Sequence, residues 1–240
     1  KPIPLFFLLC GFILTDTLKA QTSNDYVNWG DVMADQKDYQ KAIEYYKRAI
    51  ELNPKNAEAY INRGAARGQI EDYAGAIEDY TSVIKLTPKD KIIYYDRAIA
   101  RNNIKDYKGA LEDYDKAIEL DPKYSEAYYK RGGDKQQLKD YAGAIEDYNK
   151  TIQLTPNLAV AYNNRALLKD KLKDYKGAID DYSKAIEIDP ALTLAYNNRG
   201  LVRQLQQDYI GAIEDYNMVI EINPKDATAY YNRGLLKQKS

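Results

Sequence analysis

The strongest constraint on this chain is a nine-residue sequence, Asp-Tyr-Ala-Gly-Ala-Ile-Glu-Asp-Tyr, that occurs at residues 72–80 and again at 140–148. The two copies begin 68 residues apart, which is twice 34, and variants at 106–114, 174–182 and 208–216 keep the same phase. A degenerate copy stands at 38–46. A fixed period of this length predicts a solenoid in which each repeat packs only against its neighbours.

Each repeat has the pattern of two helices. From residue 23 the chain divides into six blocks of 34 residues, ending at residue 226, and a partial seventh block covers 227–240. The sixteenth residue of each full block is an aspartate that can cap the second helix, and a proline stops that helix. Apolar residues recur at helical spacing without strand alternation, so the pattern predicts an all-α chain. The aspartates are Asp38, Asp72, Asp106, Asp140, Asp174 and Asp208, and the prolines are Pro54, Pro88, Pro122, Pro156, Pro190 and Pro224.

Composition narrows the range of functions. The chain has 35 lysines and arginines against 36 aspartates and glutamates, so its net charge is −1 and its pI is near 5.8. Such a chain has no basic field to attract nucleic acid, and we expect no nucleic-acid partner. Histidine is absent, and the only cysteine, Cys10, lies in a segment that we expect to be removed. Without an imidazole base, a thiol or a Cys/His metal site, we predict no enzyme activity, no cofactor and no metal.

Residues 1–20 differ from the repeats. The basic Lys1 precedes an apolar run at 3–14, and small and polar residues follow up to Ala20. This layout is typical of a secretory signal peptide, and we predict cleavage after Ala20 and export to the periplasm or the extracellular space. The run is shorter than the roughly twenty residues of a membrane span, so no span is predicted. An uncleaved amphipathic anchor is the alternative interpretation.

The repeats resemble the tetratricopeptide repeat (TPR) family, whose motif has a small residue in the first helix, an alanine in the second and an aromatic residue four places later. The resemblance covers residues 23–240 and implies a right-handed α-solenoid. It implies six tandem helix-turn-helix repeats over 23–226 and a lone first helix of a seventh repeat over 227–240. The small residues are Gly30, Gly64, Ala98, Gly132, Ala166, Gly200 and Gly234; the alanines are Ala42, Ala76, Ala110, Ala144, Ala178 and Ala212; the aromatic residues are Tyr46, Tyr80, Tyr114, Tyr148, Tyr182 and Tyr216.

Two departures from the family motif are systematic. Before the small residue, where the family has leucine, the first copy has Trp29 and the later copies have arginine, with a second basic residue four places on. An aspartate follows sixteen residues after the arginine, whereas the first copy has Tyr45 there. Because a partly buried arginine needs a partner, this covariation predicts an arginine–aspartate pair within each repeat. The arginines are Arg63, Arg97, Arg131, Arg165, Arg199 and Arg233, and the aspartates are Asp79, Asp113, Asp147, Asp181 and Asp215.

Adjacent carboxylates such as Glu146 and Asp147 are also open to interpretation as a general acid–base pair. A catalytic site is singular, however, and this pair recurs in repeat after repeat. We therefore favour the structural interpretation of the acidic residues, and we interpret the tyrosines as packing residues rather than as a stacking platform.

The resemblance also implies that the first helices line a concave groove. The sixth residue of most blocks is asparagine, and the fifth is tyrosine or asparagine in the later blocks. This column resembles the asparagine ladder with which some family members hold extended peptides, because a carboxamide offers a donor and an acceptor to a peptide unit. The alternative is that these asparagines are merely solvated. The candidate groove residues are Asn28, Asn62, Tyr95, Asp96, Tyr129, Lys130, Asn163, Asn164, Asn197, Asn198, Tyr231 and Asn232.

We therefore expect a non-enzymatic protein-binding scaffold that is exported and that presents its groove to an extended peptide or a partner helix. The alternative is a structural segment of a longer array that stacks end to end, with self-association through the helix at 227–240. The clamp that some family members use for chaperone tails needs lysine and arginine at inner positions, and only Lys130 supplies such a charge.

Overall fold

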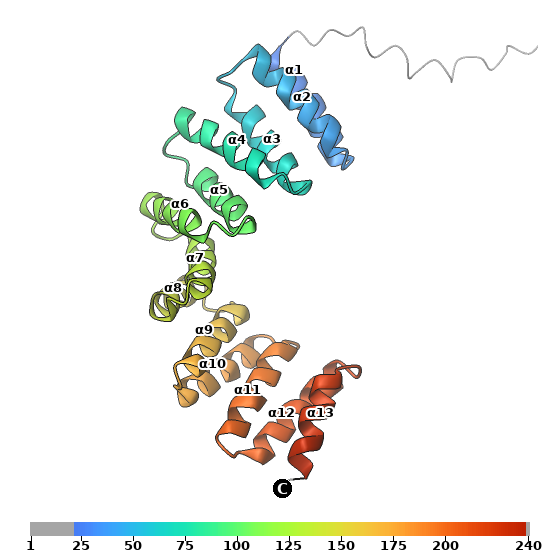
Figure 1. The fold of residues 1–240 in the computed structure, drawn as a ribbon, viewed down its shortest axis with the longest axis vertical. Coiled ribbons are helices and arrows are strands. Elements are labelled where there is room, and N and C mark those ends of the chain that lie inside the picture. The colour runs from blue at the N-terminus through green and yellow to red at the C-terminus, as the bar shows by residue number, and fades with distance from the viewer. Residues whose placement is uncertain (1–21, 239–240) are drawn as a thin grey trace, which may run out of the picture. The chain divides into compact units, whose positions relative to one another are not determined.

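The computed structural model describes residues 22–238, and these residues form thirteen α-helices and no strand (Figure 1). The predicted signal peptide at residues 1–20 lies outside the described residues. The all-α architecture of paired helices predicted from the sequence is confirmed. The helices are α1 (Ser23–Asp35), α2 (Tyr39–Leu52), α3 (Ala57–Gln69), α4 (Tyr73–Leu86), α5 (Lys91–Asn103), α6 (Tyr107–Leu120), α7 (Ser125–Gln137), α8 (Tyr141–Leu154), α9 (Ala159–Lys171), α10 (Tyr175–Ile188), α11 (Thr193–Leu205), α12 (Tyr209–Ile222) and α13 (Ala227–Lys237).

The helices belong to two compact units, one ending at Ile104 with α1 to α5 and one beginning at Lys105 with α6 to α13. Within each unit the two helices of a repeat pack together, as α3 does with α4 and α9 with α10. The second helix of one repeat then packs on the first helix of the next, as α4 does on α5 and α10 on α11. This alternation is the nearest-neighbour packing expected of stacked repeats.

The turn inside each repeat shows why the second helix begins where it does. The Asp72 carboxylate accepts a hydrogen bond from Gly75 N at 3.0 Å, and the equivalent aspartates cap α6, α8, α10 and α12 in the same way. Asp72 N donates to Arg67 O at 2.9 Å, which closes the turn from the other side. The residue between these bonds, Glu71, is held in the left-handed region at φ 64°. The predicted capping role of the aspartates is therefore confirmed.

The tyrosine of each second helix fills the space between the two helices of its repeat. The Tyr148 side chain is buried, and a Cβ added to Gly132 of α7 would lie 3.1 Å from its ring. Ala144, one turn earlier on α8, is fully buried. The absence of a Cβ at Gly132 lets the ring and the α7 backbone approach closely. Small residue and tyrosine together therefore set the spacing of the helix pair.

Two glycines of α3 test this spacing within one helix. An added Cβ would lie 2.9 Å from the Tyr80 ring at Gly64, and it would meet nothing within 4 Å at Gly68. Alanine has a helix propensity higher than that of glycine by up to about 1 kcal/mol, so Gly68→Ala should stabilise the chain by an amount of that order. Gly64→Ala should stabilise less or destabilise, because the ring has to move. Urea unfolding of both variants measures the difference, and an equal gain from both would contradict this account of the packing.

Candidate functional site

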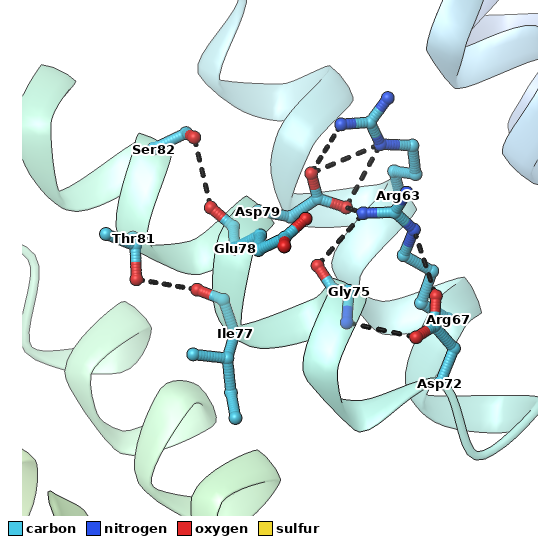
Figure 2. A network of polar contacts seen from close by, with 9 residues as sticks. All are labelled: Arg63, Arg67, Asp72, Gly75, Ile77, Glu78, Asp79, Thr81 and Ser82. Atoms are coloured by element: carbon cyan, nitrogen blue, oxygen red, sulfur yellow. Dashed lines mark hydrogen bonds and ion pairs between the residues drawn. The ribbon is translucent and has the colours of Figure 1, made fainter.

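A buried carboxylate on the second helix holds two cationic side chains of the first helix in each well-formed repeat. In the second repeat, Asp79 accepts hydrogen bonds from Arg63 Nε at 3.0 Å and from an Arg63 terminal nitrogen at 2.5 Å (Figure 2). Arg67 donates to the same carboxylate at 2.9 Å and to Gly75 O at 2.9 Å. Asp79 is almost wholly buried. Its negative charge is therefore compensated by two cations that approach from one side.

The same cluster recurs in the second unit. Arg165 donates through Nε to Asp181 Oδ2 at 2.8 Å and through a terminal nitrogen to Oδ1 at 2.5 Å. Lys169 Nζ lies 2.8 Å from Oδ2. Equivalent clusters join Arg131, Lys135 and Asp147, and Arg199, Arg203 and Asp215. The predicted pairing of arginine with the aspartate of its own repeat is confirmed in these repeats.

From the third repeat onward, each of these arginines also reaches the preceding repeat, which the sequence pattern did not indicate. Arg165 donates to Asn149 at 2.6 Å, sixteen residues earlier, and stacks over the Tyr162 ring at 5.5 Å. Arg131 makes the corresponding bond to a carboxylate, Asp115, at 2.5 Å. Burial lowers the pKa of Arg131, but Asp147 and Asp115 outweigh that effect and hold it above its ordinary value. The remaining bonds of this kind join Arg97 to Thr81, Arg199 to Ser183 and Arg233 to Asn217.

The first repeat replaces this cluster with aromatic packing. Trp29 takes the place of the arginine and Tyr45 that of the aspartate, and their rings meet edge to face at 5.8 Å between centroids. Tyr26 packs against Trp29 in the same manner at 5.4 Å. Both members of the ion pair are therefore exchanged together, as their covariation in the sequence predicted.

The carboxylates of these clusters are occupied by cations of their own repeat. The Asp181 carboxylate accepts hydrogen bonds from Arg165 on both oxygens while Lys169 lies against one of them, and its side chain is only 7% exposed. Within residues 22–238 no group of three acidic, histidine or cysteine residues is placed to hold a metal ion. We assign the acid–base clusters to stability.

Four of the predicted groove residues of the second unit are linked to one another across neighbouring first helices. Asn164 of α9 donates to the Tyr129 hydroxyl of α7 at 3.1 Å. Asn163 donates to Asn164 Oδ1 at 3.3 Å and accepts from Asn198 of α11 at 3.4 Å. Asn163 is buried. In the first unit Asn62 donates at 2.8 Å to Asp31 of α1. The amide column is therefore engaged in packing between repeats, in addition to any contact with a ligand.

The column also lies beside the buried tyrosine hydroxyls of the preceding repeat. Burial raises the pKa of Tyr216 to about 12, Asp215 adds to the rise, and the amide of Asn232 opposes it. Asp96 stands in the column where most repeats have asparagine. Burial raises the pKa of its carboxyl to about 6, with a further contribution from Asp90. A neutral amide suits this desolvated place better than a carboxylate does.

The other predicted groove residues differ widely in exposure. Asn28, Lys130 and Tyr231 are exposed, whereas Tyr95 and Asn197 are half-buried. Asn28, Asn62, Tyr95 and Asp96 belong to the first unit, and the remaining predicted residues belong to the second.

The sequence analysis missed a set of exposed apolar side chains on the first helices of the second unit. On α11, Leu194, Leu201 and Leu205 are 60%, 45% and 62% exposed, and their spacing of seven and four residues places them on one face. On α13, Tyr231 and Leu235 occupy the places equivalent to Asn197 and Leu201, and they are 67% and 38% exposed. We call these residues, with Val160 of α9, the first-helix face: Val160, Leu194, Leu201, Leu205, Tyr231 and Leu235.

Comparison with known proteins identifies the class. Models of the tetratricopeptide repeat match residues 57–90, 125–158 and 159–192, and a further TPR repeat model matches 30–70, 104–133 and 205–240. The chain belongs to the tetratricopeptide repeat family. Proteins of this family are typically non-catalytic scaffolds that bind proteins or peptides. Among curated protein sequences, none is significantly similar to the chain.

Several solved structures are similar to this one. A tetratricopeptide repeat protein from Parabacteroides merdae is 23% identical with a TM-score of 0.74, covering 91% of this chain and 87% of its own. The MamA protein is 27% identical with a TM-score of 0.67, covering 70% of this chain and 92% of its own. YrrB, described as a TPR protein with an unusual peptide-binding site, is 20% identical with a TM-score of 0.67, covering 79% and 97%. Over residues 22–238, no helix is both long and apolar enough to cross a membrane.

The Arg165–Asp181 pair provides a test of the buried clusters. Their side chains are 16% and 7% exposed, so Asp181→Ala should cost about 3–5 kcal/mol because it leaves two buried cations without their carboxylate. A double-mutant cycle with Arg165→Ala should give clear coupling in urea unfolding. The exposed Lys184–Glu187 pair of the same helix is the control, and its coupling should not exceed about 1 kcal/mol. Equal coupling in both pairs would refute the structural role of the buried cluster.

Asp96 should make the chain less stable as the pH rises, whereas most aspartates make a folded protein more stable as the pH rises. Its carboxyl pKa is about 6 in the folded chain and lies near the ordinary 3.8 when unfolded, so the folded form binds the proton more tightly. Its contribution is therefore fully favourable below pH 4 and is lost as the pH rises towards 6. Asp96→Asn should match the wild type at pH 4 and exceed it above pH 6, by at most about 3 kcal/mol. Urea unfolding from pH 4 to 8 measures this, and a constant difference between the two proteins would contradict it.

Proposed function

We propose that the chain is a non-enzymatic scaffold that binds an apolar segment of a partner protein on the first-helix face. The observation that carries this proposal is the group of exposed leucines on α11 together with Tyr231 and Leu235 on α13. Exposed apolar side chains that gather on one helix face, as the three leucines of α11 do, are a feature of interaction sites in soluble proteins.

The position of these residues separates them from the apolar surface that every repeat exposes. Leu52, Leu86 and Ile222 end the second helices, and Leu138 and Leu172 follow first helices, so their exposure recurs with the repeat. In the first unit, by contrast, the places equivalent to Leu201 are Asp31, Ala65 and Ile99, and those equivalent to Leu205 are Asp35, Gln69 and Asn103. In the first unit α5 shares part of this character, because Ile92, equivalent to Leu194, is 51% exposed, but α1 and α3 carry Asn24 and Glu58 there. The apolar character therefore varies between repeats and is not a requirement of the fold.

The amides beside the leucines supply polar contacts of limited strength. Asn198 uses one donor within the column, which leaves a second N–H on its amide, whereas Asn164 bonds to the hydroxyls of Tyr129 and Tyr148. A neutral hydrogen bond contributes only about 0.5–1.5 kcal/mol net, whereas fully burying a leucine contributes about 1.5–3 kcal/mol. We infer that apolar side chains of the ligand provide most of the affinity and that the amides orient its backbone. The proposal adds the leucines to the predicted column of asparagines and tyrosines, which stays a prediction.

Two further parts of the proposal rest on the sequence. Non-enzymatic action agrees with the absence of histidine from the whole chain and with the saturated carboxylates described above. Export rests on the apolar run and the Ala20–Gln21 junction, which lie outside the described residues. N-terminal sequencing of the mature protein tests export, and a chain that retains Lys1 would overturn it.

The test of the first-helix face does not require a known partner. Peptides of sixteen residues selected from a random displayed library on the immobilised chain should be rich in apolar residues. The best peptide should bind at least tenfold more weakly, or about 1.4 kcal/mol, to the Leu201→Ser, Leu205→Ser variant in isothermal titration. Circular dichroism should show an unchanged helix content, because both side chains are exposed.

The matched control removes apolar surface elsewhere in the same unit. Leu172 and Ile210 are 54% and 74% exposed and lie off the first-helix face, so Leu172→Ser with Ile210→Ser should leave binding intact. A loss of binding in this control but not in the leucine variant would show that the face is not the site. Asn164→Ala with Asn198→Ala should weaken binding less than the leucine variant and should also lower stability, because both amides bond to neighbouring repeats.

A further inference from the structure

The exposed leucines of the first-helix face run lengthwise along α11. Leu194, Leu201 and Leu205 span eleven residues, which is about 16 Å along the helix axis. Their spacing of seven and four residues is that of a helix face that packs against a second helix lying alongside it. A ligand therefore has to follow α11 in order to cover all three side chains.

A segment that crosses the first helices would meet a different pattern. At the level of Leu205 the equivalent place on α9 is Lys171, and at the level of Leu194 the equivalent place on α13 is Thr228. Leucine stands on all three helices only at the level of Leu201. A crossing segment would therefore follow one apolar row and leave the leucines towards the two ends of α11 in water.

A ligand that follows α11 also needs partners for its backbone. The amides of the column lie at one level of α11, at Asn197 and Asn198, and between them and Leu205 the one further amide is Gln204. An extended segment along α11 would place most of its peptide groups against leucine, which neither donates nor accepts a hydrogen bond. An α-helix pairs these groups internally, so the face favours a helical ligand.

Charges at the two ends of α11 set the direction of such a helix. At the level of Leu205, Lys171 of α9 is exposed, and the acidic group beside it is Asp170. Burial raises the pKa of Asp170, and Lys171 opposes that rise. At the other end, the N-cap residues of α9 and α11 are Leu158 and Leu192, and neither makes a side-chain cap. The first-turn N–H groups there keep their partial positive charge, which attracts the negative C-terminal pole of an antiparallel helix.

We propose that the partner segment on the first-helix face is an amphipathic α-helix of at least three turns, antiparallel to α11, with acidic residues in its first turn. The inference rests on the proposed function and adds the conformation, direction and charge of the ligand. Apolar side chains of the ligand pack along the leucines of α11, with Tyr231 and Leu235 of α13 beside them. The acidic first turn lies next to Lys171.

The probes are two sixteen-residue peptides of identical composition, labelled with fluorescein at the C-terminus. Both begin with two glutamates and continue with alanine, glutamine, lysine and four leucines. In the first peptide the leucines are spaced four, three and four residues apart, and in the second they stand at alternate positions. Fluorescence anisotropy should show saturable binding of the first peptide to the chain and at least tenfold weaker binding of the second. Circular dichroism should show that the first peptide is helical when bound.

The Leu201→Ser, Leu205→Ser variant separates failure of this inference from failure of the proposed function. It should weaken binding of the first peptide at least tenfold. If the alternating peptide binds as tightly and the variant weakens it too, the face is the site but its ligand is not helical. Binding of neither peptide, while a library peptide still binds the face, would also overturn the helical ligand. Peptide binding that the variant leaves unchanged would count against the face itself.

Lys171→Glu tests the direction of the ligand. This variant should weaken binding of the first peptide roughly threefold or more, and it should tighten binding of a version that begins with two lysines. Lys176→Glu, which changes an exposed lysine on α10, is the matched control and should bind both versions as the wild type does. If the wild type prefers a peptide whose two glutamates are moved to its last turn, the ligand runs parallel to α11 and the proposal is wrong.

Discussion

The packing of the helix pairs depends on a buried aspartate of the second helix, whose single negative charge is paired with two cationic side chains of the first helix. Moving one carboxylate out of water costs several kcal/mol, and a single surface-type ion pair does not recover that cost. Here Asp79 and its equivalents receive three or four donors from two side chains one helical turn apart. The second cation also reaches a backbone carbonyl of the second helix, as Arg67 does at Gly75. The cluster therefore fixes the register of the helix pair, because no other residue of either helix satisfies both charges.

This use of the interhelical seam determines what remains for binding. The arginine and the small residue of the first helix face the second helix, and the tyrosine of the second helix faces back. The residue type can therefore differ between repeats at the places of the first helix that point elsewhere. In α1 and α3 those places carry mostly acids and amides, in α5 they include Ile92 and Ile99, and in α11 and α13 they carry leucine and tyrosine. The same fold thus presents surfaces of different polarity along one chain, without any change in the packing that holds each repeat together.

The repeat period made the helices predictable, since a signal repeated in every block outweighs ambiguity in any single one. The exchange of Trp29 with Tyr45 for an arginine–aspartate pair was predictable for the same reason, because one exception among regular copies reveals the contact. The candidate site was not accessible in this way. Whether Asn164 faces a ligand depends on Tyr129, which lies 35 residues earlier on another helix. The spacing of the leucines of α11 could have revealed them. They were missed because the analysis looked for residue types that recur in every repeat, and these leucines do not recur.

The bond from an arginine to the preceding repeat, which is present from the third repeat onward, has a mechanical consequence. The residue that receives it differs at each junction: it is a carboxylate in Asp115, an amide in Asn149 and Asn217, and a hydroxyl in Thr81 and Ser183. The residue at that place in the first repeat is Lys47, which repels an arginine. The junctions therefore differ in strength, because a hydrogen bond from arginine to a carboxylate is stronger than one to a neutral hydroxyl. Within each unit, a junction without this bond should therefore separate more readily than one that shares a full charge.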